Sequence, residues 1–457
     1  MSKFDRTREP EPGAIRGYDF PTIESRRLNN GLQTLVARHG DLPVVTVRIV
    51  VDAGAGAEVA GEQGLATLTA NALEGGTSRL DGSGLAWELE RLGVQLDTWV
   101  TWDALHVGCT AVRDQLPAVL ALLAEVVRTP AFPAGEVERL REEQLAELLQ
   151  RRVEPRALAD DMAAQFIFPD SNPYARPLLG RRESVTALDP AAVARFHASH
   201  FAPRHTAVVM TGAISAEEAH RLVERSFGGW QAKPAAGAVP AAAAPATGAV
   251  IHLVDRPGAV QSELRLGHVG LARDHQDYYP VLVMNAVLGG TFTSRLNLSL
   301  RERHGFTYGV RSAFAFRRHP GPFVIQTAVG TDVTVRAARE ALNEIDALLE
   351  QGPTEQEVAT ARRFLAGVFP LQLQTTDQLA ARLAELVTYD LPADYFAHYR
   401  DRITAVTRDD VLRAARAHVR PRELAIVVVG DAASLHQELA DLDLAPVERH
   451  TINGHAA

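Results

Sequence analysis

An internal duplication limits the fold of this chain more than any other feature of the sequence. Residues 187–212 and 405–430 align without a gap, and in both segments a helical pattern is followed by a proline-marked turn and a short apolar run. The matching positions include Val193 with Val411, His200 with His418, Pro203 with Pro421, Arg204 with Arg422, Ala207 with Ala425 and Gly212 with Gly430. A repeat of this length indicates that one structural unit occurs twice.

A second match supports the duplication and helps to set the domain boundaries. Asn71-Ala72 and Gly75-Gly76-Thr77 recur in the second half as Asn285-Ala286 and Gly289-Gly290-Thr291. Between the copies, residues 232–250 are mostly Ala, Pro and Gly, which offer little apolar area to bury and therefore predict an extended linker. We expect an N-terminal tail (1–21), a first domain (22–231), the linker (232–250), a second domain (251–447) and a C-terminal tail (448–457).

The pattern within each half predicts an α+β fold with mixed sheets. Residues 44–52 form an apolar, β-branched run typical of a strand, and a helical pattern follows near residues 64–73. Residues 137–151 and 337–349 carry apolar side chains at helical spacing among many charges, which predicts long amphipathic helices. Such helices should cover one face of each sheet and leave the other face to line a cavity.

Composition excludes several classes of function. The 457 residues include 46% hydrophobic ones, enough for substantial cores, and the net charge of −9 gives no overall attraction to nucleic acid. No apolar run is long enough to span a membrane, and residues 1–18 lack the apolar core of a secretory signal. The sequence as given therefore predicts a cytoplasmic protein, or a periplasmic one if a signal has been removed. Cys109 is the only cysteine, so no internal disulfide can form, and packing is its expected role.

One run in the second half resembles a known family. Residues 289–297 read GGTFTSRLN, and residues 300–310 read LRERHGFTYGV. This run is similar to that of the pitrilysin-type metallopeptidases, a superfamily that includes insulin-degrading enzyme and mitochondrial processing peptidase, and the likeness covers about residues 25–435. The resemblance implies a duplicated α+β domain, a zinc site in the first half and an arginine–tyrosine pair in the second, here Arg301 and Tyr308.

The expected zinc site departs from the family pattern. Catalytic members carry His-x-x-Glu-His on the first helix, where two histidines hold the metal and the glutamate activates its water. In this chain Thr67 and Asn71 stand at the histidine positions and Ala70 at that of the glutamate, so this helix should bind no zinc. The third ligand would be Glu143 or Glu147, but one carboxylate cannot hold the metal alone, and we expect both on a solvated helix face.

No other motif supplies the missing chemistry. The histidines at 197, 200 and 205 lie in the repeated helix-to-strand segment, which favours a structural or surface role. Gly289-Gly290 lacks the lysine and the spacing of a phosphate-binding loop, so no dependence on ATP is expected. We therefore expect no metal or cofactor in this chain.

Arg301 and Tyr308 are the candidate functional residues. The sequence predicts that a helix ends near His304, that Gly305 stops it and that a strand covers residues 306–314, which could bring both side chains to one concave surface. A tyrosine hydroxyl can stabilise an oxyanion, and an arginine can anchor a carbonyl or carboxylate. The alternative is that Arg301 pairs with a surface acid and Tyr308 fills a half-buried sheet.

These features, together with the resemblance to the pitrilysin-type family, suggest the non-zinc-binding subunit of a heterodimeric zinc peptidase. Its partner would be a homologous subunit that carries the zinc, and the two chains would enclose unstructured peptides. Residues 95–101 are a candidate edge strand for the substrate, with Trp99 and Trp102 beside it, although core packing is the commoner fate of such side chains. Two alternatives remain open, namely a non-catalytic scaffold and a peptide-binding homodimer of the same fold.

Overall fold

The computed structural model describes residues 13, 16–232 and 248–455, and it contains two six-stranded mixed sheets. The strands of the first sheet are β1 (Ile23–Arg27), β2 (Gln33–Arg38), β3 (Val44–Val51), β4 (Asp97–Val100), β5 (Leu105–Val112) and β6 (Thr206–Gly212). Those of the second are β7 (Val250–Asp255), β8 (Gln261–Val269), β9 (Val310–Phe314), β10 (Pro322–Gly330), β11 (Ala425–Gly430) and β12 (Val447–His450).

The order of the strands confirms the duplication. The first sheet runs β1-β2-β6-β3-β5-β4 and the second β12-β7-β11-β8-β10-β9, so five strands of one sheet have counterparts in the other. The repeated segments form the same unit twice: α7 (Pro190–His200) leads into β6, and α14 (Arg408–His418) leads into β11. Only the edge next to β2 or β7 differs, because β1 is antiparallel to β2 whereas β12 is parallel to β7.

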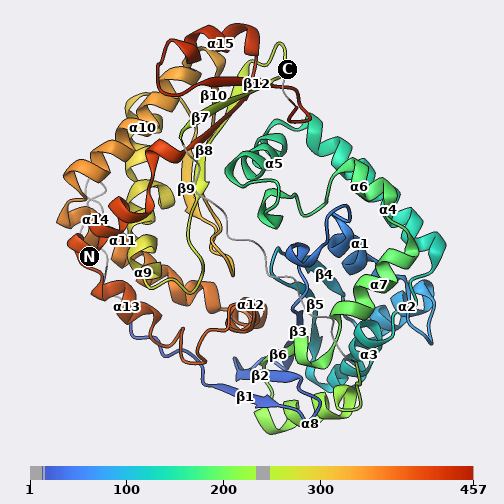
Figure 1. Ribbon diagram of the computed structural model, residues 1–457. Helices are drawn as coiled ribbons and strands as arrows, with labels where there is room; N and C mark the ends of the chain where they lie inside the picture. The colour runs from blue at the N-terminus through green and yellow to red at the C-terminus, as the bar shows by residue number, and fades with distance from the viewer. Residues whose placement is uncertain (1–12, 14–15, 233–247, 456–457) are drawn as a thin grey trace, which may run out of the picture.

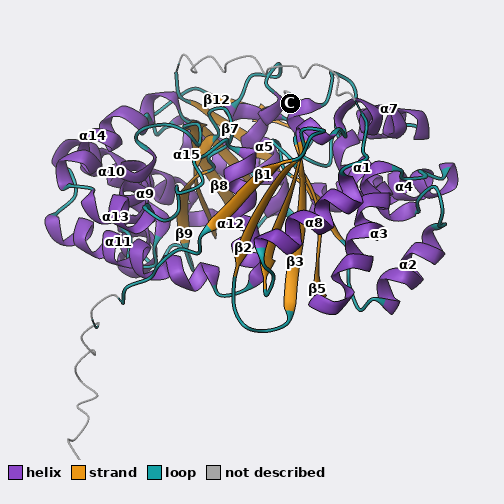
Figure 2. Ribbon diagram, turned by 90° about the horizontal axis from the view of Figure 1, so that it is seen from below, coloured by secondary structure: helices purple, strands orange, loops and turns teal. Residues whose placement is uncertain are grey.

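Helices cover the outer face of each sheet, and Figure 2 shows the two sets of helices on opposite sides of the molecule with the sheets between them. The first set comprises α1 (Leu65–Ala72), α2 (Gly82–Arg91), α3 (Leu116–Arg128), α4 (Ala134–Val153), α6 (Arg182–Ala187), α7 and α8 (Ala216–Phe227). The second comprises α9 (Tyr278–Asn285), α10 (Thr334–Gln351), α11 (Glu355–Val368), α13 (Tyr399–Ala405), α14 and α15 (Ala432–Ala440). Helical spacing explains the packing, since α3 buries Leu116, Leu120, Leu123 and Val127.

The inner faces of the sheets differ from the sequence prediction, because each is partly covered by a helix from the other half (Figure 1). α5 (Pro155–Ile167) packs on β8 and β11, and α12 (Thr376–Thr388) packs on β3 and β6. Polar side chains bridge both contacts: Arg265 pairs with Asp160 at 2.6 Å, and Arg48 pairs with Asp377 at 2.5 Å. Arginine is usually found at the protein surface, and the contacts with the distant helix help to explain why these two are buried.

The predicted tails and linker also take part in the fold where they are described. Tyr18 and Phe20 pack against the core of the second half before the chain enters β1 of the first. β7 begins at the last residue of the predicted linker, residues 233–247 lie outside the described part of the chain, and β12 extends the second sheet into the predicted C-terminal tail. Among the described helices, none is both long enough and apolar enough to cross a membrane.

Candidate functional site

The helix at the expected zinc position is α1, and buried groups hold its first turn in place. Gly64 precedes it with φ +93°, and a Cβ there would lie 2.5 Å from the carbonyl oxygen of Leu179, so only glycine fits. The carboxylate of Glu58 accepts hydrogen bonds from the main-chain N–H groups of Gly64 (3.0 Å) and Ala66 (2.9 Å). Burial raises the pKa of Glu58 to about 8. The helix is therefore well positioned even though its metal-binding residues are missing.

The side chains on α1 do not fit a zinc ion. The Thr67 hydroxyl donates to the carbonyl oxygen of Leu178 at 2.7 Å, Ala70 is buried and has no donor atom, and Asn71 is exposed. Neutral hydroxyl and amide groups are poor substitutes for the imidazoles that zinc prefers. Within the described residues, the groups of three metal-ligating side chains lie elsewhere, in the second half.

The two candidate third ligands lie on α4, which packs against α1. Glu143 and Glu147 are both exposed, and Glu143 pairs with Arg139 one turn earlier on the same helix. Glu143 and Asn71 line one open hollow together with the acids Glu74, Asp81 and Glu136. Among the described residues, these acids do not form a group of three ligand atoms close enough to share one ion. Their exposure matches the solvated helix face that the sequence indicates.

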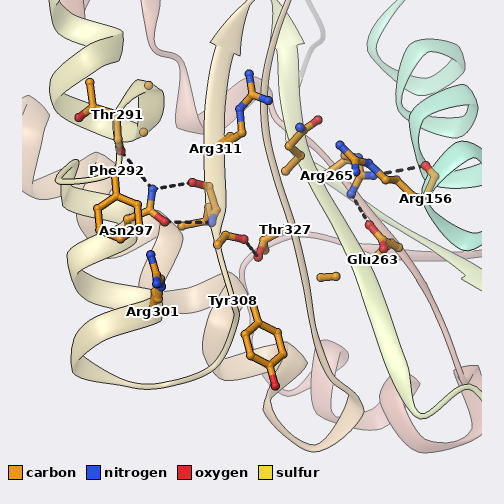
Figure 3. Close-up of a pocket in the computed structure, with 16 residues that line it drawn as sticks. Arg156, Glu263, Arg265, Thr291, Phe292, Asn297, Arg301, Tyr308, Arg311 and Thr327 are labelled. Carbon is orange, nitrogen blue, oxygen red and sulfur yellow. Dashed lines mark hydrogen bonds and ion pairs between the residues drawn. The ribbon is translucent and has the colours of Figure 1, made fainter. Parts of the chain in front are cut away.

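The second half contains a cleft of about 500 Å³, which we call the arginine-lined cleft (Figure 3). Its walls come from β8, β9, β10, the start of α5 and the segment between α9 and β9. The lining side chains that the following argument uses are Arg156, Arg265, Asn297, Arg301, Tyr308, Arg311 and Thr327. The two candidate functional residues therefore line the same cleft.

Arg301 lies on η7 (Asn297–Arg303), a short π-helical segment that ends where the sequence predicts a helix end. Its guanidinium carbon lies 4.3 Å from the centre of the Phe292 ring, a cation–π distance. Its nearest acid is Glu302, with 3.5 Å between Nε and the carboxylate, which is too long for a strong hydrogen bond. The guanidinium thus keeps most of its hydrogen-bond donors for a ligand.

Tyr308 extends from the loop between η7 and β9, and 97% of its surface is exposed. The loop itself is held firmly. Gly305 turns the chain with φ +64°, and Phe306 packs against the core of the second half. The Thr327 hydroxyl donates to the carbonyl oxygen of Gly309 at 3.0 Å. A fixed loop therefore presents a tyrosine ring that the described part of the chain leaves almost fully exposed.

Asn297 joins η7 to the start of β9, a role that the sequence did not reveal. Its amide nitrogen donates to the carbonyl oxygens of Val310 (2.8 Å) and Thr291 (3.2 Å), and its oxygen accepts from the N–H of Val310 (3.2 Å). The amide takes the position of a further strand at this edge of the sheet. Asn285 bonds the carbonyl oxygen of Ser312 in the same way, at 3.0 Å. The outer edge of β9 is thereby closed to an added strand.

Comparison with known proteins decides the family. The model described as Insulinase (Peptidase family M16) matches residues 35–180, and that described as Peptidase M16 inactive domain matches residues 187–365. This chain belongs to peptidase family M16. A crystal structure of a peptidase M16 inactive domain from Pseudomonas fluorescens has a TM-score of 0.84 and 26% identity, covering 90% of this chain and 98% of that one. The resemblance and the α+β fold expected from the sequence are confirmed.

Two curated relatives from this M16 family have contrasting names. An uncharacterized zinc protease of Streptomyces coelicolor is 25% identical over 93% of this chain and 95% of its own length. A protein of Helicobacter pylori named non-peptidase homolog YmxG is 23% identical over 92% of this chain and 96% of its own. The similar proteins therefore include one named a zinc protease and one named a non-peptidase homolog, and the residues on α1 bear directly on which of the two this chain resembles.

Further arginines of this M16 chain reach the cleft. Arg311 follows the alternation of β9, in which Val310 and Ser312 are buried, so its exposure could have been inferred from the sequence. Arg156 comes from α5 of the other half, and no local pattern points to it. Arg265 is different, because it is only 2% exposed and is already paired with Asp160 and Glu263. Arg156, Arg301 and Arg311 make the cleft suitable for carbonyl and carboxylate groups.

The other residues considered from the sequence pack within the fold. Residues 97–100 form β4 at an edge of the first sheet, where Trp99 stacks on His106, and the Trp102 indole donates to the carbonyl oxygen of Arg176 at 3.0 Å. Cys109 is buried.

The histidines of the repeated segment lie apart from the cleft. His197 makes a 2.8 Å contact with the carbonyl oxygen of Val127, His200 packs edge-on against Phe196, and His205 lines a separate small pocket.

Proposed function

We propose that this chain is the non-zinc-binding subunit of a heterodimeric M16 peptidase. It forms half of the peptide chamber and supplies Arg301 and Tyr308 to a zinc centre held by a homologous partner. One observation carries the proposal: α1 offers no zinc ligands, whereas the second half presents an exposed tyrosine on a fixed loop beside an arginine with donors to spare. The exposed Tyr308 ring gains no stability from packing within its own chain. Such a side chain is suited to a surface that another chain completes.

The chemistry of the pair supports this role. The Tyr308 hydroxyl can donate a hydrogen bond to the oxyanion formed when water adds to a peptide carbonyl. Arg301 can anchor a neighbouring carbonyl, since its charge is permanent and Phe292 holds the guanidinium plane. With Arg156 and Arg311 nearby, the cleft favours an extended peptide with carbonyl groups along its length.

The expected substrates are unstructured peptides bound as an added strand. Asn285 and Asn297 occupy the outer edge of β9, so β4 of the first sheet is the better edge for main-chain pairing. Two of the similar proteins have names that agree with a chain that is inactive alone: the Pseudomonas fluorescens structure is called an inactive domain and the Helicobacter pylori protein a non-peptidase homolog.

The test combines the purified chain with a homologous M16 subunit that carries His-x-x-Glu-His. We expect a complex of one copy of each and metal-dependent cleavage of unstructured peptides. Tyr308→Phe and Arg301→Ala should each lower kcat/KM by about 10²–10³ without changing the size of the complex. Arg303→Ala is the matched control, because Arg303 lies on the same segment, is 66% exposed and does not line the cleft.

Full activity in both the Tyr308 and the Arg301 variant would refute the proposed role. A complex that forms but never cleaves peptides would favour the non-catalytic scaffold instead. A stable homodimer that binds peptides and ignores the zinc subunit would favour the peptide-binding alternative.

A further inference from the structure

Three side chains that can bind a metal meet on one face of the second sheet, away from the arginine-lined cleft. β12 is parallel to β7, and their register places Glu448 opposite His252. His450 follows Glu448 by two residues, so all three side chains point to the same face. The sheet itself therefore gathers two imidazoles and one carboxylate from positions almost 200 residues apart in sequence.

The distances among the three ligand atoms are those of a metal centre. His252 Nδ1 lies 3.1 Å from His450 Nε2, so the two rings share a hydrogen bond that a bound ion would replace. One oxygen of Glu448 lies 3.6 Å from the first nitrogen and 3.7 Å from the second. Three atoms with these separations share a point about 2.1 Å from each of them, which is the length of Zn–N and Zn–O bonds. The two contacts of the carboxylate are too long for hydrogen bonds.

We propose that His252, Glu448 and His450 bind one divalent first-row transition-metal ion, with zinc as the best match to two imidazoles and a carboxylate. Three protein ligands leave a fourth position, and Glu448 is 56% exposed, so water can complete the tetrahedron from the solvent side. The ion would fasten β12 to β7 and so fix the end of the second sheet.

The surroundings prepare both histidines for a metal. Phe166 of α5 stacks on the His252 ring with 3.9 Å between centres and fixes its plane. The second nitrogen of His450, Nδ1, is buried beside the main chain of Gly454.

A second group of similar composition, His275, Asp277 and His418, serves as a contrast. His275 Nδ1 already accepts from the main-chain N–H of Asp277 at 3.0 Å. The Asp277 carboxylate contacts His418 at 2.7 Å and Arg413 at 2.8 Å. Protein donors thus occupy the atoms that would bind an ion, and a permanent positive charge lies beside them. We assign no metal to this group.

The test is zinc binding to the full chain after removal of metals with a chelator, measured by isothermal titration calorimetry. We expect one zinc per chain and a higher unfolding temperature when zinc is present. Glu448→Gln and His450→Asn should each weaken zinc binding by on the order of 100-fold, whereas the control His418→Asn should bind zinc like the original chain. Glu448 is exposed, so its substitution tests the site even if His450→Asn fails to fold.

The inference is overturned if the original chain binds no zinc. It is equally overturned if the Glu448→Gln variant binds zinc with unchanged affinity and stoichiometry. Either result would leave the proposed role of Arg301 and Tyr308 untouched, because the two sites share no residue.

Discussion

Asn297→Ala should loosen the loop that carries Tyr308. In the native chain the Asn297 amide satisfies both the N–H and the carbonyl oxygen of Val310, a residue that is almost fully buried. Alanine leaves these two buried groups without partners, at a cost of roughly 1–3 kcal/mol each when water cannot reach them fully. We therefore expect local opening of the loop and the start of β9 to become easier by about 3 kcal/mol.

Hydrogen exchange of the main-chain amides measures this opening directly. A change of about 3 kcal/mol corresponds to a roughly 100-fold loss of protection, which should be confined to the loop and β9. Asn343→Ala is the matched control, since Asn343 is exposed on α10 and makes one hydrogen bond, to Glu340. If the main-chain amides of β9 were as well protected from exchange in the Asn297→Ala variant as in the original chain, the Asn297 side chain would not be what holds the loop.

Two further substitutions test the packing between and within the halves. Arg265→Met removes the ion pair between α5 and the second sheet and leaves Glu263, whose side chain is only 15% exposed, without its cation. Thermal unfolding should therefore show a loss of about 3 kcal/mol that the exposed Arg303→Met does not share, and an unchanged midpoint would contradict this. Glu58→Gln tests the cap of α1: folding raises the pKa of Glu58 from 4.5 to about 8, so its contribution to stability is complete below pH 4.5 and is lost as the pH rises to 8. The variant should therefore gain stability relative to the original chain by roughly 1.4 kcal/mol per pH unit across this window. Tryptophan fluorescence can follow the unfolding of the first half, because all 4 tryptophans lie there. A stability difference between the variant and the original chain that does not vary with pH would refute this prediction.

Much of the fold could be predicted because the signals are local and occur twice. The helix, turn and strand of residues 187–212 recur at 405–430, and both copies have the predicted elements. The exchange of α5 and α12 between the halves could not be predicted in this way. Arg265 and Asp160 are 105 residues apart, and no periodicity connects them.

In the candidate site, too, the residues placed by a local pattern could be predicted from the sequence, whereas those that come from distant parts of the chain could not. Gly305 and the alternation that follows it place Tyr308 and Arg301 near the start of β9. Arg156 reaches the cleft from the other half, which no motif indicates. The histidine pair at β7 and β12 was also missed, because its members are 198 residues apart and the second lies in a segment that reads as a tail.

The most direct test of the central claim is hydrolysis of an unstructured fluorogenic peptide by the chain alone with zinc supplied. The same assay should be run on the Glu448→Gln, His450→Asn double variant. Zinc bound at β12 then cannot account for any hydrolysis that is observed. We expect no turnover from either form, and chelator-sensitive turnover once the homologous zinc subunit is added. Chelator-sensitive hydrolysis by the chain alone, at a rate similar to that of the mixture, would contradict the claim that α1 cannot support catalysis.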